Sequence, residues 1–179
     1  MVQETVDLDP GRLEAALERY ERPLLGYARR LLGDVEQARD VVQDVFLRLC
    51  REPMALDDPR LKPWLYRVCR NRAIDVLRKE RRMHMLDDGE RLTSTSAEPA
   101  QAVAAQDEQH RLVAHVRALP PRQQEVVWLR FQGGLSYRQI AEVTRHSVSH
   151  VGVLLHEAMT TLRARLGDAT ATWAAEEAS

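Results

Sequence analysis

A stretch near the middle of the chain cannot contribute to a hydrophobic core, and it limits the folds that are open to the rest. From Asp87 to Gln106 the sequence has few large apolar residues and no sustained periodicity, which is typical of a linker. A chain of 179 residues can form one medium domain or two small ones, and this stretch favours two. We predict a domain, a flexible acidic linker, a second domain and a disordered tail, at residues 1–85, 86–108, 109–166 and 167–179.

The formal net charge of −1 hides a strong division of charge along the chain. Five consecutive segments carry net charges of −5, +7, −5, +5 and −3, for residues 1–59, 60–84, 85–110, 111–166 and 167–179. Blockwise asymmetry of this kind points to nucleic-acid binding. The two basic blocks fall in different predicted domains, so we expect each domain to face DNA.

Composition disfavours other classes of protein. Aromatic residues make up 5% of the chain, which argues against an all-β sandwich or barrel. No apolar run approaches the roughly 20 residues of a membrane span, and the first residues lack the basic-then-apolar order of a signal peptide. Two cysteines cannot form a disulfide framework or a four-cysteine zinc site. We expect an all-α cytoplasmic protein without metal, cofactor or membrane contact.

One predicted helix has two distinct faces. Asp34 is a good N-cap with Gln37 three residues on. An apolar stripe at helical spacing follows, made of Val35, Ala38, Val41, Val42, Val45 and Leu49. The opposite face is polar except for Leu47. A solvated face with one exposed leucine is the interpretation that the pattern alone favours, and a ridge that binds a basic helix of a partner is the alternative.

The first basic block is predicted to form a helix over residues 61–82, with Pro63 at its start. At about 100° per residue, one sector roughly 100° wide contains Arg67, Arg70, Asn71, Ile74, Arg78 and Arg81. Trp64 and Tyr66 lie near the start of this stripe. Arginines bind phosphates, aromatic rings stack on unpaired bases and an asparagine reads a base edge. We prefer a surface for single-stranded bases to a solubilising arginine face, which would normally mix both signs of charge.

The second half contains the pattern of a helix-turn-helix. Gly133-Gly134 is a stop signal, and Ser136 with Gln139 forms a capping-box pattern. Thr144-Arg145-His146 then leads to a second cap at Ser147 and a helix from Val148 to about Leu166. Two helices joined by about three residues are typical of a helix-turn-helix, whose second helix enters the major groove. An αα-hairpin in an ordinary bundle is the alternative.

The predicted recognition helix carries no Lys or Arg from Ser147 to Leu162, which argues against base-specific reading by this helix. We take its inward side to be Val148, Val151, Leu155, Ala158 and Leu162. The candidates to face DNA are then Ser149, His150, Gly152, Val153 and His156. Phosphate contacts would come from Arg122, Arg138 and Arg145. The histidines, together with His146, also suggest a metal site or a pH switch, but no Cys or carboxylate lies at ligand spacing.

Four blocks of sequence, taken together, resemble the extracytoplasmic-function (ECF) sigma factors of the bacterial sigma-70 superfamily. They are DVVQDVFLRL, WLYRVCRNRAIDVLR, LPPRQQEVV and GLSYRQIAE, at residues 40–49, 64–78, 119–127 and 134–142. The likeness covers about residues 13–166. It implies an N-terminal sigma2 domain and a C-terminal sigma4 domain, no catalytic chemistry, and a monomer when free. Such proteins bind core RNA polymerase, direct it to promoters, help open the DNA and are candidates for control by an anti-sigma factor.

The resemblance also implies roles for individual residues. The set that matches the surface docking on the β′ clamp coiled coil is Asp40, Gln43, Asp44 and Leu47, which favours the ridge interpretation. The set near the melting −10 element is Trp64, Tyr66, Arg67, Arg70, Asn71 and Arg78. Within it, Asn71 matches a position that captures a flipped base.

For the sigma4 domain the resemblance implies a −35 surface and an apolar contact with the β flap. The −35 candidates are Arg138, Arg145, Ser147, Ser149, His150, Gly152, Val153 and His156. The flap contact would lie near Val126, Val127 and Leu129. A stand-alone helix-turn-helix regulator that binds duplex DNA without polymerase is the alternative, although it has little use for the aromatic and basic block at Trp64–Arg82. An enzyme such as a nuclease is disfavoured because no carboxylates cluster.

Overall fold

The computed structural model describes residues 10–52, 54–86 and 112–176 of the chain. The regular secondary structure in these ranges is helical, which confirms the predicted all-α fold. The chain divides into two compact units, Met1–Ala97 and Glu98–Ser179. Apart from Leu86, the predicted linker at residues 86–108 lies outside the described residues.

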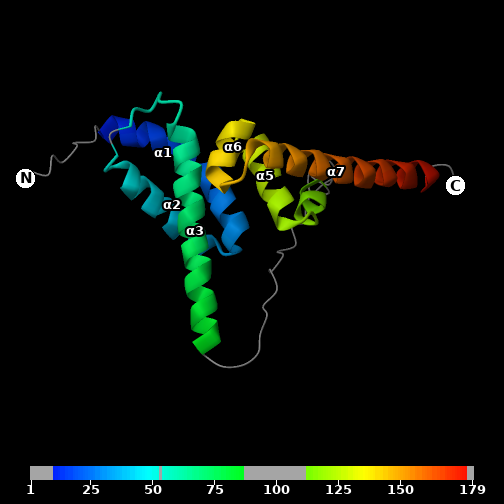
Figure 1. Cartoon of the computed structure of the whole chain (residues 1–179), viewed down its shortest axis with the longest axis horizontal. Helices are drawn as coiled ribbons and strands as arrows, with labels where there is room; N and C mark the ends of the chain where they lie inside the picture. Colours follow the sequence, from blue (N-terminus) through cyan, green and yellow to red (C-terminus); the bar gives the residue numbers. More distant parts are fainter. Residues whose placement is uncertain (1–9, 53, 87–111, 177–179) are drawn as a thin grey trace, which may run out of the picture. The chain divides into compact units, whose positions relative to one another are not determined.

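The first unit consists of three helices that pack against one another (Figure 1). They are α1 (Pro10–Leu32), α2 (Val35–Leu49) and α3 (Leu61–Leu86). Their buried side chains recur every three or four residues, as the helical repeat requires. The core is formed by Ala16, Tyr20, Leu24 and Tyr27 of α1, Val41, Val42, Val45, Phe46 and Leu49 of α2, and Leu61, Leu65, Tyr66, Cys69 and Ala73 of α3.

The start of α2 follows the sequence prediction. The Asp34 carboxylate accepts a hydrogen bond from the Gln37 backbone N–H at 2.7 Å, so Asp34 is the N-cap, a contact that stabilises a helix by about 1 kcal/mol. The Gln37 side chain does not complete a capping box: its amide nitrogen donates to the Glu80 carboxylate of α3, and its buried amide oxygen accepts no hydrogen bond among the described residues. The predicted apolar stripe is buried, except that Val35 is half-buried and Phe46 joins it.

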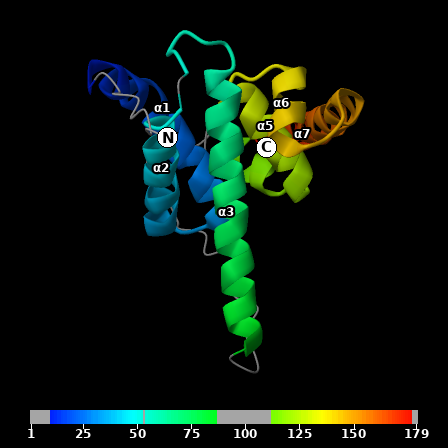
Figure 2. The same ribbon diagram turned by 60° about the vertical axis from the view of Figure 1, so that its left-hand side comes forward.

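The C-terminal half of α3 extends beyond the rest of its unit. Among residues 61–83 of α3, whose burial is described, Ala73 is the last that is fully buried, and the helix continues to Leu86. Figure 2 shows this half of α3 continuing past the end of α2. Side chains there are exposed on several sides, so this half offers a surface to a partner and contributes little to the core.

The second unit is built around a helix-turn-helix. A helical segment at residues 112–117 precedes α5 (Pro121–Phe131), α6 (Tyr137–Thr144) and α7 (Val148–Glu176). Ser136 and Gln139 form the predicted capping box, and Ser147 accepts a hydrogen bond from the His150 backbone N–H at 3.1 Å. Gly133 ends α5 tightly, because a Cβ there would lie 2.6 Å from the Leu129 carbonyl oxygen. The predicted caps and stop are confirmed.

The last helix is longer than predicted. We expected α7 to end near Leu166 and a disordered tail to follow, but the helix continues to Glu176. The predicted end of the helix near Leu166 is therefore wrong, and residues 177–179 lie outside the described part. The physical reason is that extending an existing helix needs no new nucleation, and the alanines in this segment have the highest helix propensity of any residue.

The turn between α6 and α7 contains the one non-glycine residue with a left-handed backbone among the described residues. Arg145 caps α6 with φ 61° and ψ 32°. In this conformation the Cβ of an L-residue approaches the following carbonyl, which costs about 1–2 kcal/mol relative to the right-handed region. Glycine would remove this cost, so the arginine is kept at some expense in stability.

We therefore expect Arg145→Gly to stabilise the second unit by about 1 kcal/mol. The measurement is native-state hydrogen exchange of the α6 and α7 amides in the full chain. Arg145→Ala is the matched control, since it removes the same charge but keeps the Cβ, and it should give no comparable gain. Equal effects of the two substitutions would contradict backbone strain at this position.

Candidate functional site

The four residues predicted to bind the polymerase lie together on one face of α2. Asp40, Gln43, Asp44 and Leu47 are spaced three or four residues apart, and we call them the α2 ridge. Asp40 and Gln43 are exposed, Asp44 is half-buried and Leu47 is 53% exposed. Burial of the opposite stripe of α2 in the core holds this face outward.

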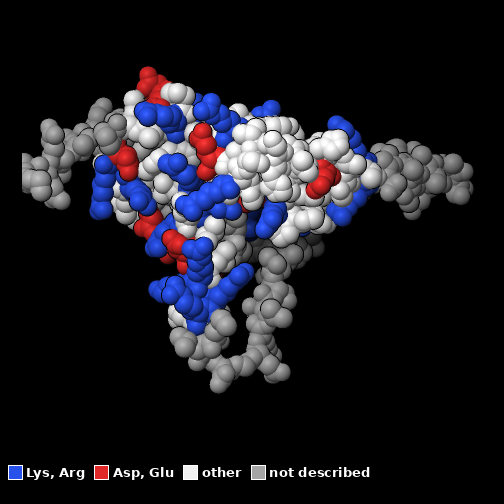
Figure 3. Space-filling view, in the orientation of Figure 1, with Lys and Arg blue, Asp and Glu red and all other residues white. Residues whose placement is uncertain are grey.

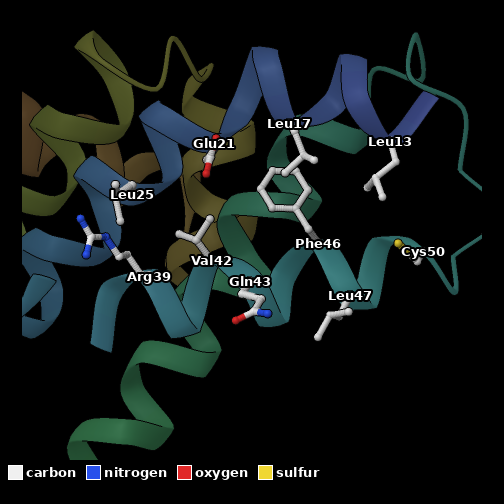
Figure 4. Close-up of a pocket in the computed structure, with 10 residues that line it drawn as sticks. All are labelled: Leu13, Leu17, Glu21, Leu25, Arg39, Val42, Gln43, Phe46, Leu47 and Cys50. Carbon is white, nitrogen blue, oxygen red and sulfur yellow. The ribbon is translucent and has the colours of Figure 1, made fainter. Parts of the chain in front are cut away.

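An apolar groove of about 400 Å³ runs along one side of the α2 ridge, between α1 and α2. Figure 4 shows Phe46 reaching toward Leu17 of α1, whereas Leu47 projects from α2 away from α1. Gln43 and Leu47 belong both to the ridge and to the groove lining. The sequence patterns above did not predict this groove. Leu13, Leu17 and Leu25 recur at helical spacing along α1, and this repeat indicates the apolar side of α1 that lines it.

The other side of the α2 ridge faces a polar groove between α2 and α3. Asp44 forms an ion pair with Arg72 of α3 at 2.6 Å, with both side chains about half exposed. An exposed pair of this kind contributes no more than about 1 kcal/mol. Among the described residues Asp40 has no ion-pair partner, so its carboxylate is available to a cation of another molecule.

The basic side chains predicted to bind DNA lie along α3. Arg67 and Arg78 are exposed, whereas Trp64, Arg70 and Asn71 are half-buried. Arg78 lies 3.6 Å from Asp75, an exposed contact that leaves its guanidinium accessible. Figure 3 shows Lys and Arg gathered over the protruding half of α3, where Lys79, Arg81 and Arg82 are also exposed.

Tyr66 does not belong to this DNA-facing set. Its side chain is only 3% exposed, and its ring packs against Tyr27 of α1 with 5.4 Å between centroids. The prediction that it contacts unpaired bases is therefore wrong, because a ring inside the core cannot stack on a base. Tyr66 follows Leu65 on the inward side of α3. It was assigned to DNA because it lies near the start of the stripe in the sequence and because it matches a family position near the −10 element. Trp64 remains the aromatic candidate.

Burial also changes how two core groups ionise. Burial, with a smaller contribution from the neighbouring Cys69 thiol, raises the pKa of Tyr66 to about 12 from an ordinary 10.0. Burial raises the pKa of Cys69 to about 12 from an ordinary 9.0. The folded unit therefore keeps protons that the unfolded chain releases from about pH 9 upward. These two groups leave the free energy of unfolding unchanged below about pH 9 and lower it as the pH rises toward 12.

We expect this linkage to lower the free energy of unfolding by on the order of 1–3 kcal/mol per group by pH 11. The measurement is urea denaturation of the full chain at pH 8 and at pH 10.5, with unfolding followed by circular dichroism. Tyr66→Phe and Cys69→Ala should each reduce the loss of stability between the two pH values. Cys50→Ala, at a less buried thiol, should retain the full loss. A loss of the same size in all four proteins would rule out the two core groups as its cause.

In the second unit, the structure places most of the predicted −35 residues on the exposed side of the helix-turn-helix. Arg138 and Arg145 of the α6 region and Ser147, Ser149, His150, Val153 and His156 of the α7 region are exposed, and Gly152 is half-buried. One inward assignment is wrong: Val148 is 48% exposed, because it lies in the first turn of α7, at the edge of the buried stripe. Leu154, which was not assigned inward, is buried.

The residues predicted to contact the β flap are not available at the surface. Val126, Val127 and Leu129 are at most 5% exposed and form part of the core of the second unit. This part of the prediction is wrong, since the apolar side of α5 packs against α6 and α7. Phe131 at the end of α5 is 63% exposed.

The histidines give no sign of a metal centre. His146 and His150 contact edge to face, with 4.9 Å between ring centroids. Within the described residues no group of three or more His, Cys, Asp or Glu side chains could hold a metal ion.

In the same part of the chain, no helix combines the length and the apolar character that crossing a membrane requires.

Comparison with known proteins identifies the class to which this fold and these surfaces belong. The family model "Sigma-70 region 2" matches residues 16–83 in the first unit, and "Sigma-70, region 4" matches residues 110–162 in the second. The chain belongs to the sigma-70 family of RNA polymerase sigma factors, and within it to the ECF group.

Two ECF relatives illustrate the match within this group. The ECF RNA polymerase sigma factor SigL of Mycobacterium tuberculosis H37Rv is 31% identical over 158 residues, covering 86% of this chain and 88% of SigL. SigW of Bacillus subtilis strain 168 is 26% identical over 160 residues, covering 83% of this chain and 86% of SigW.

Solved structures support the fold. The sigma factor RpoE of Bartonella quintana, in complex with the anti-sigma factor NepR, matches with a TM-score of 0.66 at 23% identity and covers 86% of this chain and 96% of its own. CnrH, in complex with the cytosolic domain of CnrY, matches with a TM-score of 0.58 at 23% identity, covering 87% of this chain and 88% of CnrH. At this identity the likeness concerns the fold alone.

Proposed function

We propose that the chain binds core RNA polymerase and directs promoter recognition, DNA melting and transcription initiation. The observation that carries this function is the ordered match of sigma-70 regions 2 and 4 to its two units. We further propose that it has no enzymatic activity of its own and acts in the cytoplasm, where its polymerase partner is found. A stand-alone duplex-binding regulator needs no sigma-70 region 2, and we do not favour it.

The α2 ridge is our candidate for the polymerase contact. It combines an unpaired carboxylate at Asp40, an amide at Gln43 and an exposed apolar side chain at Leu47. Exposed apolar and acidic groups in a row along a helix suit a helical partner with basic side chains. The coiled coil of the β′ clamp is the partner that the family implies. Because these side chains contribute little to the core, they can be replaced without unfolding the unit.

We expect Asp40→Lys to weaken binding to core polymerase by roughly tenfold or more, because it replaces attraction by repulsion at the contact. The measurement is equilibrium binding of the labelled full chain to purified core polymerase. Glu18→Lys on the exposed side of α1 has the same charge change outside the ridge and should bind normally. Unchanged core affinity in Asp40→Lys would remove the α2 ridge from the interface.

We assign α3 to the −10 element. Its arginines supply phosphate contacts, Trp64 supplies a stacking surface and the half-buried Asn71 amide lies between Arg67 and Arg78 along the same stripe. A half-buried amide is held in place by its surroundings, so it can bind a base that has left the helix at a lower entropic cost than a mobile side chain. This arrangement favours single-stranded bases over intact duplex.

We expect Asn71→Ala to reduce formation of open complexes by roughly tenfold, the equivalent of one or two lost hydrogen bonds, with core affinity unchanged. Open complexes are followed by the fluorescence of 2-aminopurine placed in the −10 element. Glu18→Ala, at an exposed position of α1 outside the proposed DNA surface, controls for the truncation of an exposed side chain. If Asn71→Ala lost core affinity and opening to the same extent, the residue would not have the assigned role.

The second unit is our candidate for the −35 element and for the β flap. Arg138 and Arg145 flank the exposed side of the helix-turn-helix and suit phosphate contacts. The Glu142 carboxylate is 3.8 Å from Arg138, too weak an exposed pair to hold the guanidinium. We also propose that an anti-sigma factor binds this chain, since the sigma factor RpoE is found in a complex with the anti-sigma factor NepR, and that the free chain is a monomer.

A further inference from the structure

The outward side of the first turns of α7 carries no charge. Buried residues define the inward side of the helix: Val151, Leu154, Leu155, Ala158 and Leu162. At 100° per residue the opposite direction falls on four side chains, which we call the reading strip: Ser149, Val153, His156 and Thr160. Glu157 lies at one edge, where its carboxylate accepts a hydrogen bond from Gln123 of α5 at 3.0 Å.

Val153 is the one apolar side chain of the reading strip, beside the polar Ser149, His156 and Thr160. It is 52% exposed, so about half of its surface faces outward. The Thr160 hydroxyl donates to the His156 carbonyl at 2.9 Å, which uses its only donor within the helix. Next to Val153, a Cβ on Gly152 would meet only the Tyr137 ring, at 3.9 Å. The helix therefore has room beside the strip for a close approach of its backbone.

The strip itself contains no Lys or Arg, and the arginines of the helix-turn-helix lie on other elements. Arg138 and Arg145, on and just after α6, are both exposed. Arg130 of α5 lies over the Tyr137 ring at 5.6 Å and donates to the Leu135 carbonyl at 3.0 Å, so it is held at the start of α6. Figure 3 shows an uncharged area over the α6–α7 region. Arginines on the neighbouring elements suit phosphate contacts, while a strip without Lys, Arg, Asp or Glu is left to face the base edges.

We infer that Val153 reads a thymine of the −35 element through the C5-methyl group of the base; this rests on the proposed sigma-factor function. In the major groove thymine is the base that presents a methyl group, and apolar side chains contact it, whereas guanine is read by Arg or Lys. A helix without Lys or Arg can therefore still distinguish thymine from the other bases. Removal of one buried methyl group corresponds to about a fourfold loss of affinity.

The test uses holoenzyme formed from the full chain and core polymerase of the source organism, on a genomic fragment where it starts RNA. Each thymine of the −35 region is replaced in turn by deoxyuridine, which lacks only the methyl group. We expect at least one position where the replacement weakens holoenzyme binding about fourfold. With Val153→Ala, binding to the thymine promoter should weaken and the difference between the two bases at that position should vanish.

Val148→Ala is the matched control, because Val148 is equally exposed but lies about 110° away from the centre of the strip around the helix. It should retain the fourfold discrimination. The inference is overturned if no thymine is sensitive, or if Val153→Ala keeps the discrimination. It is also overturned if Val153→Ala weakens assembly with core polymerase in the absence of DNA, which would make the strip a protein contact. Failure to form holoenzyme or to start RNA on any fragment would contradict the proposed function itself.

Discussion

Burial of the apolar stripe of α2 between α1 and α3 is the interaction on which the first unit depends. Val41, Val45 and Leu49 are almost completely inaccessible to water, and burying side chains of this size stabilises a fold by about 1.5–3 kcal/mol each. The same packing determines the rotation of α2 about its axis. Once that rotation is set, the residues of the α2 ridge have no position other than the surface. The residues that stabilise the unit and those that we propose for the polymerase contact thus lie on opposite faces of one helix.

The second unit applies the same principle to α7. Val151, Leu155 and Ala158 fix the rotation of the helix against α5 and α6, and Val153 is thereby turned outward. The sharp turn before α7 holds Arg145 in the left-handed backbone region, where glycine would lower the conformational free energy of the turn. In the −35 surface that we propose, an arginine brings a phosphate-binding charge that glycine lacks, which gives a strained residue a use at this position.

Sequence patterns predicted the features that depend on local chemistry. The caps at Asp34, Ser136 and Ser147 rest on hydrogen bonds within a few residues, and all are present. Features that depend on packing between helices were less accessible. Tyr66 resembles a stacking residue in the sequence, and only the contact with Tyr27 of α1 shows that it belongs to the core. The apolar residues Val126, Val127 and Leu129 were likewise predicted to face a partner, and only their burial in the second unit shows that they belong to its core. The groove between α1 and α2 is lined by residues of both helices, so it could be predicted only from the packing of one helix against the other.

The central claim is that the two units act together as a sigma factor, and reconstituted transcription tests it most directly. Purified full-length chain is added to core polymerase and genomic DNA fragments, and the RNA 5′ ends are mapped. The account predicts RNA that starts at defined positions only when both the chain and core polymerase are present. Absence of a complex with core polymerase, together with no start that depends on the chain, would contradict it.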